Sequence, residues 1–227
     1  MADKGRAEFA HAGGTVGAAE VRVQRNEGGS SYIMSGNDAL LDTGSLLIAG
    51  LGTGDFTQNA GTVECTSLTV GNGNVGTYSM NGGTLTVEGG DMQMATANPN
   101  AASTFTHSAG TVTVDTGDLL VGASFNAGSA LYRAGGDAVL DVAGSVIVGS
   151  TFTNRDPTWT FEVDGSGSGS IDVGGWTQRN QTADKPGVLS LVFDEGGILT
   201  INVDGNVSFA DGTLLDVTPP CMYRMGW

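Results

Sequence analysis

The sequence is poor in cysteine and in basic residues, and each shortage excludes a class of protein. Two cysteines in 227 residues are too few for a disulfide framework, and Cys65 falls where a small apolar thiol packs well. Nine lysines and arginines stand against 24 acidic residues, which leaves a net charge of −15. Nucleic acids and anionic membrane surfaces are bound mainly through Lys and Arg, so neither partner is expected.

Proline and long apolar runs are also scarce. Five prolines do not make a disordered Pro-rich linker, and no run of 18 apolar residues is present, so no membrane insertion is expected. The opening residues, MADKGRAEFA, lack the apolar core of a signal peptide, and we expect a fragment of a longer chain. Walker, HExxH, CxxC and GxSxG motifs are absent.

Glycine and a sequence repeat are what the chain has instead. Its 38 glycines are typical of many tight turns between ordered strands. The segment 56–77, FTQNAGTVECTSLTVGNGNVGT, shows the repeating unit: an aromatic residue, a few small or polar residues, Gly-Thr, and then apolar residues at every second position. Steps of 22 to 31 residues separate the first residues of the units, which are Phe9, Tyr32, Phe56, Tyr78, Phe105, Leu131, Phe161 and Val192. Such steps indicate stacked supersecondary units.

The alternation within a unit predicts strands that are buried on one face. No stretch keeps a helical period over three turns, which excludes helical repeats. The inward pairs expected on the second strand are Ala39 and Leu41, Val63 and Cys65, Leu85 and Val87, Val112 and Val114, and Ala138 and Leu140. Those expected on the third strand are Val21 and Val23, Leu46 and Ile48, Leu68 and Val70, Met92 and Met94, Leu119 and Val121, Val146 and Val148, Ile171 and Val173, and Val207 and Phe209.

The predicted fold is all-β: a single-domain, right-handed parallel β-helix (β-solenoid) of about eight coils over residues 1–217. Its handedness follows the general rule for parallel crossovers. Residues 176–189 form a loop insertion in the seventh coil, and residues 218–227 form an irregular C-terminal tail. The glycines expected at the corner after the third strand, where positive φ lets the chain change face, are Gly50, Gly71, Gly122 and Gly149.

Acidic residues recur in the turn between the second and third strands. If the coils stack in register, Glu88, Asp115 and Asp141 share one column, and Asp91 lies beside Asp118 in another. Carboxylates about 5 Å apart repel each other, and oxygen-rich clusters of this kind suit Ca²⁺. The sequence therefore suggests a calcium ledge, and calcium is the one cofactor considered. Solvated turn carboxylates are the alternative, because the nonapeptide GGxGxDx calcium repeat is absent.

A glycan platform is the second candidate site. Trp159, Trp176, Arg179 and Asn180 combine stacking surfaces with polar groups, as glycan sites do. The structural alternatives are core packing for Trp159, a loop anchor for Trp176, and a solvated loop tip for Arg179 and Asn180.

No constellation indicates catalysis, so no catalytic residue is assigned. Parallel β-helices host polysaccharide lyases and hydrolases, which makes polysaccharide cleavage the enzymatic alternative. The basic residues that a lyase needs are scattered over the units. His11 and His107 hold equivalent positions four coils apart, which indicates repeat drift rather than a site.

A threonine array is a third possibility for the outer surface. Thr62, Thr84 and Thr111 form an outward column, and regular ladders of this kind order water in ice-binding proteins. Asp38 and Glu64 interrupt the array, and threonine is in any case a good residue for the outer face of a strand.

Three sequence features together resemble a known repeat family. They are the pattern aromatic-x-x-x-(Ala/Gly)-Gly-Thr, a Leu-x-Val-Gly strand end, and the closing segment GGILTINVDGNVSFADGTLLDV. Over about residues 8–217 they look like the autotransporter-associated β-strand repeats of secreted or surface-anchored bacterial proteins. The resemblance implies an extracellular or cell-surface solenoid that serves as a stalk, adhesin or scaffold.

We therefore expect a structural or adhesive module of a bacterial secreted or surface protein, without catalysis, whose partner is a polysaccharide or another surface protein. The alternative is a polysaccharide-binding or polysaccharide-modifying β-helix. Neither end of the stack has an evident cap, and an uncapped end exposes core and unpaired backbone groups. End-to-end association with a second copy, or continuation in a longer chain, is the expected consequence.

Overall fold

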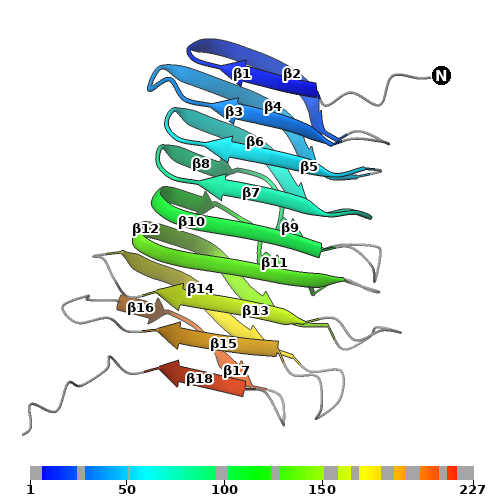
Figure 1. Cartoon of the computed structure of the whole chain (residues 1–227). Helices are drawn as coiled ribbons and strands as arrows, with labels where there is room; N and C mark the ends of the chain where they lie inside the picture. Colours follow the sequence, from blue (N-terminus) through cyan, green and yellow to red (C-terminus); the bar gives the residue numbers. More distant parts are fainter. Residues whose placement is uncertain are drawn as a thin grey trace, which may run out of the picture.

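The computed structural model describes residues 7–24, 29–50, 52–95, 102–123, 128–150, 158–164, 169–179, 187–192, 200–209 and 214–218. Within these ranges all regular elements are β-strands, and the strands pair in parallel as stacked coils. Figure 1 shows the coils following one another from the N-terminal to the C-terminal end of an elongated molecule. The described residues include no helix long and apolar enough to cross a membrane. The all-β solenoid is confirmed, and the number of coils differs slightly from the expected eight.

A coil contributes up to three strand segments, and some strands run continuously through a corner. The strands are β1 (Ala7–His11), β2 (Gly14–Val23), β3 (Ser30–Met34), β4 (Ala39–Ile48), β5 (Gly54–Gln58), β6 (Thr62–Val70), β7 (Gly76–Met80), β8 (Thr84–Val87), β9 (Met92–Met94), β10 (Ala102–Val114), β11 (Leu119–Val121), β12 (Ser129–Val148), β13 (Trp159–Asp164), β14 (Ser170–Gln178), β15 (Gly187–Val192), β16 (Thr200–Val203), β17 (Val207–Phe209) and β18 (Leu214–Thr218).

The first strand of each coil up to β13 places an aromatic ring inside the tube, and these rings stack. Neighbouring centroids in this aromatic stack lie 4.6 to 5.1 Å apart. Tyr132, and not Leu131, belongs to it, because Tyr132 pairs with both neighbouring rings. In the coil after Phe161 the equivalent residue is Leu189, and not Val192. The stack consists of Phe9, Tyr32, Phe56, Tyr78, Phe105, Tyr132 and Phe161.

The other two strands of each coil build the aliphatic part of the core. Leu68, Met92 and Leu119 pair directly with one another, as stacked coils require, and all three are fully buried. The predicted pair Ile171 and Val173 is also buried, but it lies on the second strand of its coil, in register with Leu140 and Val142.

Trp176 and Gln178 hold the third-strand positions of that coil. Val207 pairs with Trp176, as its predicted inward position requires, yet its side chain is 53% exposed near the C-terminal end of the stack.

The residue at the corner after the third strand has a positive φ angle, in the left-handed region of backbone conformation. Gly71, Gly122 and Gly149 have φ angles of 77°, 69° and 92°, as predicted. In the second coil the residue with a positive φ is Ala49, at 60°, and not Gly50. Ile48 pairs with Val70, so Ala49 holds the position that Gly71 holds in the next coil. Ala95, at φ 53°, is a second alanine with this conformation, in a later coil. The corner geometry is therefore set by the coil rather than by glycine alone.

Polar side chains are buried inside the tube at the end of alternate first strands. His11, Gln58 and His107 share one column there with Met34 and Met80. In each polar residue the Nε2 atom lies 2.9 to 3.1 Å from the backbone carbonyl oxygen of the residue three positions later. A carbonyl only accepts hydrogen bonds, so in both histidines Nε2 donates and Nδ1 is left to accept.

The acceptor on each of these side chains meets a tyrosine hydroxyl of the following coil. The oxygen of Tyr32 lies 2.8 Å from His11 Nδ1, and that of Tyr132 lies 3.0 Å from His107 Nδ1. The Tyr78 hydroxyl donates to Gln58 Oε1 at 2.6 Å. The true structural period from the first to the sixth coil is therefore two coils: one with a Phe ring and a buried polar residue, then one with a Tyr ring.

Candidate functional site

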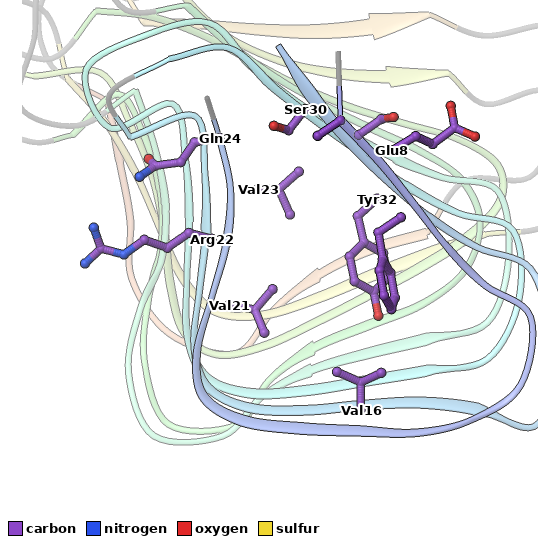
Figure 2. A pocket seen from close by; sticks show the side chains of 11 residues that line it. Glu8, Val16, Val21, Arg22, Val23, Gln24, Ser30 and Tyr32 are labelled. Carbon is purple, nitrogen blue, oxygen red and sulfur yellow. The ribbon is translucent and has the colours of Figure 1, made fainter. Parts of the chain in front are cut away.

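Among the described residues, nothing covers the interior of the tube on the N-terminal side of the first coil. This end hollow has a volume of about 520 Å³ and is lined by residues of β1, β2 and β3. In Figure 2, Val16, Val21, Val23 and Tyr32 lie within the coil that surrounds the hollow, whereas Arg22 points away from it. The hollow is the end of the apolar core itself.

Among the described residues, those around the end hollow have a neighbouring coil on one side only, whereas residues of internal coils have one on both sides. Phe9 stacks on Tyr32 at 4.9 Å on one side, yet its side chain is 50% exposed. Ser31 Oγ is buried at the hollow without a hydrogen-bond partner. Within the described residues β1 pairs with β3 and β2 pairs with β4, so their opposite edges present unpaired backbone groups. Such an edge is a template for another strand.

The calcium ledge does not form as drawn from the sequence. Val87 pairs with Val114, which places Glu88 beside Asp115, and both are exposed. Asp141 pairs with Thr113, so it lies outside that column. Two displacements of one residue cause this: Phe105 pairs with Tyr132 and not with Leu131, and the pairing of β10 with β12 shifts once more between His107 and Ala109.

Asp91 and Asp118 do lie beside each other, and they bind backbone groups. The Asp118 amide donates to Asp91 Oδ1 at 3.0 Å, and the Ser145 amide donates to Asp118 Oδ1 at 2.7 Å. Each carboxylate thus satisfies a backbone donor of the next coil at a corner. The described residues contain no group of three or more His, Cys, Asp or Glu placed to hold a metal ion.

The predicted glycan platform is wrong for its two tryptophans. Trp159 is fully buried, and its Nε1 donates to the Gly128 carbonyl at 3.0 Å. Trp176 is 2% exposed and meets the Phe161 ring edge-on at 5.0 Å. Neither indole offers a face to a ligand, because both complete the core where the aromatic stack ends.

The predicted loop at 176–189 begins and ends in strands. Trp176 belongs to β14, and Leu189 belongs to β15. The Arg179 amide donates to the Val148 carbonyl at 2.8 Å, which continues the ladder of β14. Asn180 and residues up to 186, together with the predicted tail from 219 onward, lie outside the described residues.

Buried titratable groups contribute no accessible chemistry. Burial raises the pKa of the Cys65 thiol to about 12, with the charge of Glu88 adding to the effect. Burial also raises the pKa of Tyr32 to about 12 and lowers the pKa of His107 to about 4. These groups are neutral at pH 7, and the fully enclosed His107 meets no solvent.

The threonine array extends further than the sequence indicated. Thr62, Thr84 and Thr111 pair as predicted on the second face. Hydroxyl side chains also fill both outward columns of the first face in the fourth and fifth coils. The alternation around the aromatic residue of each first strand is the sequence signal that predicts this second array. Its members are Thr77, Ser79, Thr104 and Thr106.

Comparisons of the chain with family models, with curated proteins and with solved structures found no match in any of the three.

Proposed function

We propose that the chain is a structural or adhesive module of a bacterial secreted or cell-surface protein, without catalysis. In this proposal the solenoid is a single right-handed domain that holds its outer faces away from the surface to which it is attached. The uninterrupted stack of rings and aliphatic ladders carries the proposal, because such a core gives an extended, stiff body. The resemblance to autotransporter-associated repeats supports the same function and an extracellular location.

The end hollow supplies the proposed partner contact. A coil placed on β1 and β2 would continue the backbone ladder and cover the exposed half of Phe9. The partner is a second copy of the chain, added end to end, since the surface between successive coils already joins like to like along this chain. Calcium as a cofactor stays a prediction.

Association is tested with a charged residue at the open end. Phe9→Glu places a carboxylate on the exposed ring position, and Val75→Glu is the matched control, because Val75 is 48% exposed at a corner far from the end. Light scattering after size-exclusion chromatography should give a mass that rises with concentration for the wild type and for Val75→Glu, but not for Phe9→Glu. A wild type that stays monomeric at every concentration would refute the end-to-end contact.

Adhesion is tested separately with beads coated with the chain. Retention on immobilised cell-surface polysaccharide should exceed that of beads coated with an unrelated protein of equal net charge. Equal retention of the two kinds of bead would remove the adhesive function and leave the scaffold. Release of shorter saccharides from the polysaccharide would instead favour the enzymatic alternative.

A further inference from the structure

A shallow groove lies on the outer surface of the solenoid, on the face formed by the first strands of the coils. It crosses the starts of the first strands of three successive coils. It has a volume of about 300 Å³ and spans β10, β12 and the start of β13. Its outward side chains combine hydroxyls, one aliphatic group and one carboxylate. They are Thr104, Ser129, Leu131, Thr158, Thr160 and Glu162.

The register of the coils sets the order of these groups. Thr104 pairs with Leu131, and Leu131 pairs with Thr160, so one aliphatic side chain lies between two hydroxyls in a single column. Neighbouring coils are about 4.8 Å apart, which separates the two threonines by about 9.6 Å. Leu131 is half-buried and interrupts the hydroxyl array that the preceding coils present here.

Glu162 adds an oriented acceptor beside this column. Arg133 Nε lies 2.6 Å from Glu162 Oε1, and Arg133 Nη2 donates to Oε2 at 3.2 Å. Two-point contact of this kind holds the carboxylate in one orientation and offsets its charge. Each carboxylate oxygen still has a lone pair to accept a further hydrogen bond.

We propose that this groove binds one hexose residue of a neutral polysaccharide. The apolar C–H face of a sugar ring would lie on Leu131, and its hydroxyls would meet Thr104, Thr160 and Glu162, the mixture of an apolar floor and a few placed polar groups that ligand sites use. The net charge of −15 opposes uronate or sulfate sugars, which selects a neutral glycan. This inference rests on the adhesive part of the proposed function and moves its glycan contact away from Trp159 and Trp176.

The test removes hydroxyls without changing shape. The double variant Thr104→Val and Thr160→Val loses the two hydroxyls that flank Leu131, and valine suits a strand. Its control, Thr84→Val with Thr111→Val, removes two outward hydroxyls from the second face. Calorimetric titration uses cellohexaose, laminarihexaose, maltohexaose and mannohexaose, with hexagalacturonate as the acidic probe.

At least one neutral hexasaccharide should bind saturably to the wild type and to the control, and hexagalacturonate should not. The groove variant should bind that saccharide about tenfold more weakly, which corresponds to the loss of two ordinary hydrogen bonds. Absence of saturable binding to all four neutral probes overturns the site, as does an equal loss in both variants. Beads that adhere as strongly with the groove variant as with the wild type would overturn the groove alone and leave adhesion standing.

Discussion

His107 is a neutral imidazole inside the tube because the tube gives its charge no solvent. Its Nε2 donates to the Gly110 carbonyl, and its Nδ1 faces the Tyr132 hydroxyl, so both nitrogens are used in the neutral form. Desolvation is the larger effect on its pKa and lowers it to about 4, although the backbone bond to Gly110 acts in the opposite direction.

Stability should therefore fall as the pH is lowered from 6.5 towards 4. A free histidine titrates at 6.5, so the unfolded chain takes up a proton in this range before folded His107 does. The neutral residue contributes its full stability above pH 6.5, and that stability is lost towards pH 4, by on the order of 3 kcal/mol. Urea unfolding at a series of pH values measures the loss.

His107→Gln is the control, since Gln58 shows that glutamine fits the same column. Carboxylates also titrate near pH 4, but they do so in both proteins, so the difference between the two curves reports His107. Parallel curves for the wild type and His107→Gln would contradict the assignment.

At the scale of the strand, a buried polar residue and the next tyrosine form a unit. Tyr132→Phe removes the hydroxyl and leaves His107 Nδ1 buried without a partner, which costs about 1 to 3 kcal/mol. Adding His107→Met should recover most of that loss, because Met34 and Met80 already occupy this column. Urea unfolding of the two single variants and the double variant at pH 7.5 measures the coupling, and strictly additive losses would show that the pair is not a unit.

The coil architecture was predictable because alternation needs only the distinction between apolar and polar residues. Leu68, Met92 and Leu119 follow an unbroken alternation, and they stack as expected. Where two large residues are adjacent, the alternation within one coil does not show which of them points inward. Leu131 and Tyr132 are such a pair, and only the pairing with neighbouring coils shows that the tyrosine points inward.

The candidate sites were predictable only where the pairing of the coils is unbroken. Asp91 and Asp118 lie side by side as expected, because Met92 and Leu119 next to them pair directly. The acidic column failed because Tyr132, and not Leu131, opposes Phe105 and because the pairing shifts again after His107, which together place Asp141 beside Thr113. The sequence predicts a loop at Trp176 because its alternation does not show that Ile171 and Val173 belong to the second strand of the coil and Trp176 to the third. The groove around Leu131 needs the register of three coils to the residue, which composition and spacing do not supply.

At the scale of the whole molecule, each coil contacts its immediate neighbours, so stability is approximately a sum over coils and the contacts between them. Figure 1 shows this linear order. A coil removed in register should therefore shorten the molecule without unfolding it. The alternation of Phe and Tyr coils adds a condition, because Gln58 depends on Tyr78 of the next coil. Two coils, and not one, are the unit that can be removed without loss of a buried hydrogen bond.

Deletion of residues 56–104 joins Asp55 to Phe105 and removes a complete Phe and Tyr pair of coils. The shorter chain should unfold cooperatively with the circular dichroism of a β-protein, because Phe105 then stacks on Tyr32 as Phe56 did. Deletion of residues 78–104 removes one coil and leaves Gln58 without the Tyr78 hydroxyl, which costs about 1 to 3 kcal/mol. Gln58→Met should therefore stabilise the one-coil deletion, whereas in the full chain the same substitution should destabilise, because it takes the acceptor from Tyr78. Urea unfolding in which Gln58→Met has the same effect on both chains would mean that the coils stack one by one, and that the pairing of polar residues with tyrosines contributes nothing to the order of the molecule.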